Sequence, residues 1–138
     1  MAYWLFKSEP SSWSWDEQMA AGEAGTAWTG VRNHQAKAHL QAMQVGEEGF
    51  FYHSGEGKAV VGIVAVTRPY YPDPTDASGR FGCVDLRAVA SLPEPVTLEA
   101  VKARAEFAEM VLVRNSRLSV QPVTEAEWRA LRRLGGLG

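Results

Sequence analysis

The run AVVGIVAVT, residues 59–67, restricts the fold of this chain more than any other feature. It is rich in β-branched side chains and almost wholly apolar, which predicts a strand that is buried on both faces of a sheet. A second strand pattern covers residues 49–53, and the SGEGK stretch between the two runs holds glycine at two positions. The two runs are therefore expected to form a hairpin at the centre of the fold.

Signals for short strands and helices flank this hairpin. Residues 3–7 and 80–90 have strand composition, and we expect these strands to end where prolines follow, at Pro10 and in the LPEP sequence. Helices are predicted where a capping residue precedes an apolar helical pattern. These capping residues are Ser14, Asn33, Thr97 and Thr124, and the first and last of them form capping boxes with Glu17 and Glu127.

The order of these elements indicates the fold class. Strands dominate the middle of the chain and helices its ends, and no linker, repeat or low-complexity tract interrupts the pattern. The prediction is an α+β fold in a single domain over residues 1–138. We expect the central sheet to curl into a barrel, because closure removes the exposed edges of a sheet.

Charge and composition narrow the functional class. The chain carries 14 basic and 16 acidic side chains, a net charge of -2. That balance argues against a protein that coats nucleic acid through many phosphate contacts, so any nucleic-acid role is expected to depend on a local site. The single Cys83 cannot form an internal disulfide, and neither a signal peptide nor a run of roughly 20 apolar residues is evident. We therefore expect a cytoplasmic or nucleoid-associated protein with no membrane partner.

Six ordered sequence blocks carry a resemblance to a known family. They are YWLFKSEP, WSWDEQ, WTGVRNHQA, FYHS, VVGIVAV followed by YPDPT, and RNSRLSVQPV followed by EW. Together they resemble the EVE domain family, a branch of the PUA-like superfold that is related to the YTH readers of methylated RNA. The resemblance implies a β-pseudobarrel of about five to six strands surrounded by short helices. It also implies a non-catalytic reader that binds one flipped, modified base of DNA or RNA, for example a methylated or hydroxymethylated cytosine.

Aromatic side chains suit the walls of such a pocket, because a base that leaves its stack regains energy by stacking on their rings. Trp13 and Trp15 both lie in a serine-rich turn before a helix, so one is expected to anchor the helix while the other reaches the pocket. We favour Trp15 for the pocket. The candidates from the aromatic blocks are Trp15, Trp28, Tyr52, His53 and Ser54.

Polar candidates lie at a strand end, at a helix start and near the C-terminus. Arg32 is expected to pair with a phosphate or with Glu9, whereas Asn33 has a structural alternative as a helix cap. Segments that follow a strand are common places for a binding site. The full polar set is Lys7, Ser8, Glu9, Val31, Arg32, Asn33, Arg117 and Ser119.

An enzyme is the main alternative to a reader. Lys7 and Glu9 are two residues apart, so they share one face of a strand and can act together as general acid and base. Some PUA-like relatives of the ASCH type are hydrolases of this sort, and a general RNA-binding module is a further option. The histidines stand at no metal-ligand spacing, so neither a metal nor a cofactor is expected. The expected partner is nucleic acid with a modified base, bound by a monomer.

Overall fold

The computed structural model describes residues 1–55 and 57–138, whose strands form one six-stranded sheet in the order β2-β5-β4-β3-β1-β6. The strands are β1 (Tyr3–Ser8), β2 (Thr26–Ala27), β3 (Glu48–His53), β4 (Ala59–Pro72), β5 (Gly82–Thr97) and β6 (Val120–Val123). The α-helices are α1 (Trp15–Ala20), α2 (His34–Ala42), α3 (Leu98–Lys102), α4 (Val111–Arg114) and α5 (Glu125–Leu134), and η1 (Gly22–Ala24) and η2 (Ala105–Phe107) are 3-10 helices. The α+β class is thereby confirmed.

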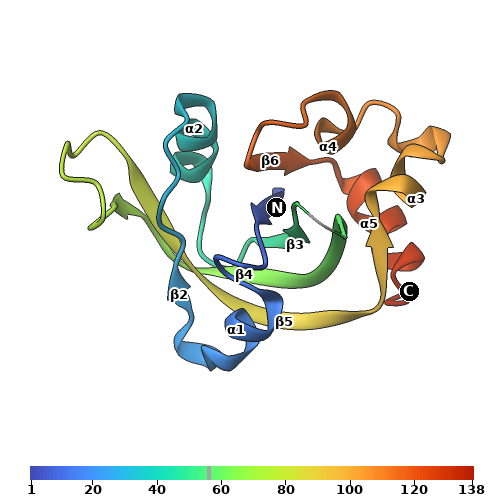
Figure 1. The fold of residues 1–138 in the computed structure, drawn as a ribbon, viewed down its shortest axis with the longest axis horizontal. Coiled ribbons are helices and arrows are strands. Elements are labelled where there is room, and N and C mark those ends of the chain that lie inside the picture. Colours follow the sequence, from blue (N-terminus) through green and yellow to red (C-terminus); the bar gives the residue numbers. More distant parts are fainter. Residues whose placement is uncertain (56) are drawn as a thin grey trace.

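The predicted hairpin lies at the centre of the sheet. β3 and β4 pair antiparallel, with Phe50 opposite Ile63, and β4 continues into a long antiparallel pair with β5. β1 lies parallel to β3 on the other side, and β6 pairs antiparallel with β1. Figure 1 shows β4 and β5 as long curved strands, with α2 on one side of the molecule and α3, α4 and α5 gathered on the other.

The sheet curves without closing into a barrel, which corrects one expectation. β2 and β6 are its two edges, and they do not pair with each other in the described part of the chain. Both edges are short, with two and four residues. Short edge strands expose few unpaired backbone groups. The short edges of this pseudobarrel therefore limit unwanted strand pairing without closure of the sheet.

The strand that was expected to end at LPEP instead continues through it as β5. Pairing with β4 jumps from Gly62 opposite Ser91 to Val60 opposite Val96, so residues 92–95 bulge out of the ladder. Proline is tolerated inside a strand at such a bulge, because no ladder partner requires its missing N–H.

The predicted helix caps are all present. The side chains of Ser14, Asn33, Thr97 and Thr124 each accept a hydrogen bond from the backbone N–H three residues later, and both capping boxes are complete. The helix that begins after Thr97 is short and ends at Lys102. Local side-chain chemistry therefore fixed where these helices begin.

Alternation along β1 divides the interior into two cores. Trp4 and Phe6 point into a core beneath α1 and α2, whereas Leu5 points into a second core that packs against α3 and α5. The second core contains Trp128, which stacks on Tyr3 with ring centroids 4.5 Å apart. The first core ends at the carboxyl end of β1, where the structure is hollowed.

Candidate functional site

A cavity of about 540 Å³ lies at the carboxyl end of β1 and is the candidate binding site. Its volume is in the range of small-molecule pockets. The predicted site residues that line it are Lys7, Ser8, Glu9, Trp28, Val31, Arg32 and Ser119. The other lining residues are Ser12, Trp13, Thr26, Ala27, Thr29 and Gly30. Three segments distant in sequence thus meet here: the end of β1 with the turn that follows it, β2 with its following loop, and the residue before β6.

Trp13 forms one aromatic wall of the cavity. Its indole N–H donates to the Gln18 side-chain oxygen at 2.8 Å, and the Gln18 amide N–H donates to the Leu86 carbonyl at 3.0 Å. Gln18 is fully buried, so this chain of hydrogen bonds fixes the Trp13 ring from its inner edge. Trp13 is half-buried and lines the cavity.

Trp28 forms a second aromatic wall at the end of β2. It is only 7% exposed, because its ring packs edge-on against Phe6 and Phe51 at centroid distances of 5.5 and 5.6 Å. Its backbone N–H donates to the Val84 carbonyl at 2.8 Å, which holds the residue beside β5. Trp28 therefore belongs to the first core and to the cavity at once.

Trp15, which was favoured for the pocket, lies in the core and does not line the cavity. Its indole N–H donates to the Ser91 hydroxyl at 2.9 Å, and its backbone N–H donates to Nε2 of His53 at 3.0 Å. The two neighbouring tryptophans thus divide their roles in the opposite way to the prediction: Trp15 anchors α1, and Trp13 faces the cavity.

The end of β1 supplies the charged groups. The Lys7 ammonium donates to the Ser116 carbonyl at 2.7 Å, and burial, with a smaller contribution from Lys58, lowers the pKa of Lys7. The Ser8 hydroxyl donates to the Trp13 carbonyl at 2.6 Å, which ties β1 to the turn before α1. Glu9 completes this group, and its backbone carbonyl accepts hydrogen bonds from the turn. The end of β1 therefore contributes one cation and one carboxylate to the cavity lining.

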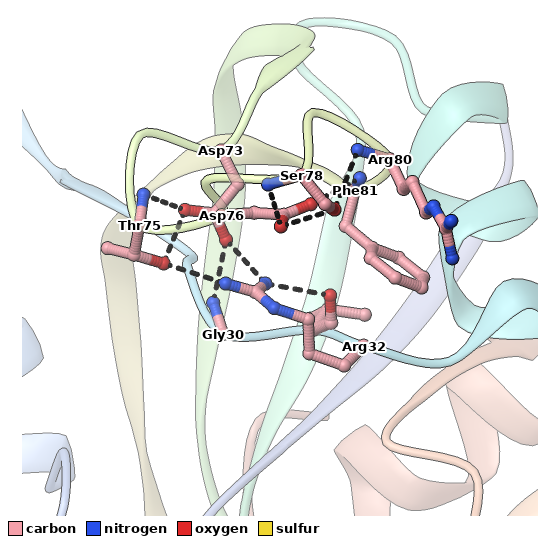
Figure 2. Close-up of polar contacts among 9 residues, drawn as sticks. Gly30, Arg32, Asp73, Thr75, Asp76, Ser78, Arg80 and Phe81 are labelled. Atoms are coloured by element: carbon pink, nitrogen blue, oxygen red, sulfur yellow. Dashed lines mark hydrogen bonds and ion pairs between the residues drawn. The ribbon is translucent and has the colours of Figure 1, made fainter.

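The loop between β2 and α2 is held by Asp73, which lies just after β4. One oxygen of Asp73 accepts from the Gly30 N–H and from the Arg32 guanidinium, both at 2.9 Å, and the other accepts from Thr75 (Figure 2). The Asp73 side chain is fully buried. Burial raises its pKa, but the hydrogen bonds from Thr75, Gly30 and Arg32 outweigh that effect and lower the pKa to about 2. Arg32 thus pairs with Asp73 and not with Glu9.

The remaining predicted residues lie outside the cavity lining. Asn33 is the cap of α2, accepting from the Ala36 N–H at 2.9 Å. Tyr52 is 2% exposed in the second core, His53 accepts from Trp15, and the Ser54 N–H donates to the Ser8 carbonyl. Arg117 is exposed in the segment that contacts Lys7 through Ser116.

Sequence reasoning missed Asp73 and Gly30 as parts of the site. The sequence DPT has the signature of an Asx turn, and Asp73 does accept from the Thr75 N–H at 2.7 Å. That local signal predicts the turn alone. Only the fold shows that the second oxygen of Asp73 reaches the loop that lines the cavity.

Within residues 1–55 and 57–138, no group of three or more His, Cys, Asp or Glu side chains is placed to hold a metal ion. No helix in these residues is both long and apolar enough to cross a membrane.

The chain is similar in sequence and in fold to proteins of other organisms. The chain is 60% identical to a protein of Rhodopseudomonas palustris solved by NMR, with a TM-score of 0.94 over 99% of this chain and 94% of that one. It is 30% identical to human thymocyte nuclear protein 1, over 92% of this chain and 71% of the human protein. A crystal structure of human THYN1 in complex with DNA containing 5-methylcytosine superimposes with a TM-score of 0.91 at 28% identity, covering 99% of this chain and 98% of that one.

More distant likeness concerns the fold alone. The YTH domain of Zygosaccharomyces rouxii MRB1, solved with N6-methyladenosine RNA, has a TM-score of 0.58 at 16% identity over 97% of this chain and 86% of that one. This likeness agrees with a PUA-like pseudobarrel. The family model described as EVE domain matches residues 2–134, and the chain therefore belongs to the EVE domain family.

Proposed function

We propose that this protein is a non-catalytic reader that binds a modified base of DNA, flipped from its stack, in the cavity at the end of β1. A methylated or hydroxymethylated cytosine is the first candidate. The observation that carries the proposal is the cavity itself, in which the indoles of Trp13 and Trp28 stand beside the polar side chains of Lys7, Ser8 and Glu9.

This combination meets the energetic requirements of a reader. Extruding a base costs a few kcal/mol, which stacking on aromatic side chains and hydrogen bonds to the base edge offset. Trp13 offers a ring already fixed through Gln18, so little conformational entropy is lost when a base stacks on it. Glu9 can accept a hydrogen bond from an exocyclic amine, and Lys7 can donate to a ring nitrogen or carbonyl.

The comparison with human THYN1 supports the choice of ligand. That protein was solved with DNA containing 5-methylcytosine, and the two folds superimpose over nearly their whole lengths. A methyl group buried against indole surface contributes on the order of 1 kcal/mol, or about fivefold in affinity. The proposed reader therefore distinguishes modified from plain cytosine by a modest factor that depends on a close fit.

Matched oligonucleotides test the proposal. Duplexes identical except for one 5-methylcytosine, one 5-hydroxymethylcytosine or one plain cytosine are titrated against the protein, with single strands and N6-methyladenosine RNA as further arms. We expect the 5-methyl or 5-hydroxymethyl duplex to bind about fivefold more tightly than the plain one. Equal affinity for all cytosine duplexes contradicts the proposal. Tighter binding of the N6-methyladenosine RNA would show that the ligand is a modified base of RNA and not of DNA.

Variants then connect the preference to the cavity. Trp13→Ala and Glu9→Gln remove a wall and an acceptor, so both should reduce binding of the modified duplex. Arg129→Gln is the control, because Arg129 lies on α5 with its side chain 70% exposed. Preference that survives both cavity variants would place the base elsewhere on the protein.

A hydrolase acting on a modified nucleoside is a second candidate, favoured by one observation. Lys7 and Glu9 line the same cavity, and burial lowers the pKa of Lys7, which increases its fraction of free amine. Incubation with methylated and N-acylated nucleosides, followed by mass spectrometry, separates the two functions. The reader leaves every substrate unchanged, whereas turnover that Lys7→Ala abolishes establishes the hydrolase.

A further inference from the structure

The geometry points to a phosphate-binding surface beside the cavity, which we call the Phe81 surface and define as Arg32, His34, Lys37, Arg80 and Phe81. It would hold the sugar-phosphate backbone of the strand whose modified base enters the cavity. This inference rests on the proposed function and extends it from the base to the flanking phosphates.

Two cations lie over the Phe81 ring. The Arg32 guanidinium and the Lys37 ammonium lie 5.9 and 5.8 Å from the ring centroid. His34 packs on the same ring with centroids 5.1 Å apart. Arg80 precedes Phe81 in the chain, is exposed, and extends from the same loop in Figure 2. The half-buried ring therefore organises positive charge drawn from two segments, the start of α2 and the loop before β5.

The carboxylates of this region are already occupied. Asp73 is buried and bonded to Arg32, Gly30 and Thr75. Asp76 accepts from the Phe81 N–H at 2.8 Å and from the Ser78 hydroxyl at 2.6 Å (Figure 2). By contrast, Lys37 and Arg80 form no ion pair among the described residues. Both carboxylates are thus hydrogen-bonded within the loop or to Arg32 and Gly30, and Lys37 and Arg80 are left without an ion-pair partner among the described residues.

Arg32 joins this surface to the base cavity. It lines the cavity, stands over Phe81, and keeps 39% of its side chain exposed although Asp73 and Thr75 fix its orientation. A guanidinium held in this way is pre-organised to contact a phosphate next to a base bound in the cavity. The adjacent first turn of α2 carries no acidic residue, so nothing there repels an anion.

A backbone phosphate fits this arrangement better than a free acidic ligand, because the surface continues from the cavity that the base would occupy. Phosphate contacts position a protein on nucleic acid and make the affinity salt-dependent without reading sequence. The Phe81 surface is therefore expected to control affinity and salt dependence but not the choice between modified and plain cytosine.

The salt dependence of binding tests this separation. The double variant Lys37→Gln/Arg80→Gln is titrated with the 5-methylcytosine duplex and with the plain duplex. The salt concentration is varied from about 50 to about 200 mM. We expect the slope of log affinity against log salt to become shallower by about 0.9 for each phosphate contact removed. Affinity for both duplexes should fall by the same factor, so their ratio is unchanged.

The matched control is Lys102→Gln/Arg133→Gln, which removes the same two charges from exposed positions on α3 and α5, on the other side of the molecule (Figure 1). It should keep the wild-type slope. A slope that is unchanged in the Phe81-surface variant, or lowered equally in the control, overturns the inference while leaving the base preference standing. A wild-type protein without base preference refutes the proposed function instead, and the slopes of the variants then still decide whether phosphates bind at this surface.

Discussion

The ring of Trp15 lies directly on the backbone of Gly62, so that a Cβ at position 62 would come within 2.3 Å of the indole. This contact explains why Trp15 belongs to the core. The central strand β4 has a glycine where the Trp15 indole packs against it, so no side chain blocks the ring. Ser91, which lies opposite Gly62 on β5, accepts the hydrogen bond from the indole N–H.

Substitution Gly62→Ala should therefore destabilise the protein. The nearest atoms belong to a large buried ring that cannot swing away, so the added methyl forces a shift of α1 or of β4. We expect a loss of about 1 to 3 kcal/mol in the free energy of unfolding, as is typical of overpacked cores. Urea denaturation measures it.

A double-mutant cycle identifies the cause. In the Trp15→Leu background the steric conflict is absent, so Gly62→Ala should cost much less than it does in the wild type. Additive losses would show that Gly62 is required for a reason other than the ring of Trp15.

The exchanged roles of the two neighbouring tryptophans give a second prediction. Trp13→Ala should weaken binding of the modified duplex by about 1 to 3 kcal/mol, the contribution of a stacking ring, and should lower stability less. Trp15→Ala should reduce the free energy of unfolding by about 3 to 5 kcal/mol, while the folded fraction binds normally. Melting curves and titrations of both variants are the measurements, and normal binding by Trp13→Ala would contradict the placement of the base.

The sequence predicted what local chemistry determines. The hairpin, the helix starts at Ser14 and Thr124, and the crowding of polar and aromatic groups after β1 all follow from residues close together in the chain. Trp13 and Trp15 have the same local signal, and what separates them is Gly62, in a strand far along the chain. The local sequence therefore predicts the turn that holds the two tryptophans, but not that Gly62 packs against one of them.

The same limit applies to β5 and to Asp73. Prolines usually end a strand, but the bulge opposite the step from Val60 to Gly62 lets β5 pass through them, and a bulge depends on the partner strand. Asp73 looks like an ordinary turn residue because its contacts with Gly30 and Arg32 join segments that only the folded sheet brings together.

His53 gives a prediction for mildly acidic pH. Its Nε2 accepts the Trp15 N–H, which requires neutral imidazole, and burial lowers its pKa below 6.5 although Asp16 acts in the opposite direction. The unfolded chain therefore takes up this proton at higher pH than the folded protein. Stability should be complete above about pH 6.5 and should fall as the pH drops through the lowered pKa.

Denaturation between about pH 8 and pH 5 measures this dependence. His53→Gln should show a weaker decline than the wild type. Burial also lowers the pKa of His39, so part of the decline should persist in the variant. An identical pH profile in the two proteins would show that His53 does not contribute.

Asp73 gives the last prediction, at lower pH. Its pKa of about 2 in the folded protein compares with 3.8 for an ordinary aspartate, a difference worth about 2 kcal/mol of stability. Because the folded pKa is depressed, this contribution is complete above about pH 4 and is lost as the pH falls through about 2. Asp73→Asn should be less stable at neutral pH, since its amide has one acceptor oxygen where the carboxylate uses two, and it lacks the charge that pairs with Arg32. The gap between variant and wild type should narrow as the pH approaches about 2. The variant should also bind the modified duplex more weakly at neutral pH, because the loop that carries Trp28 and Arg32 loses its anchor. A gap that stays constant with pH would mean that the charge of Asp73 is not what holds this loop.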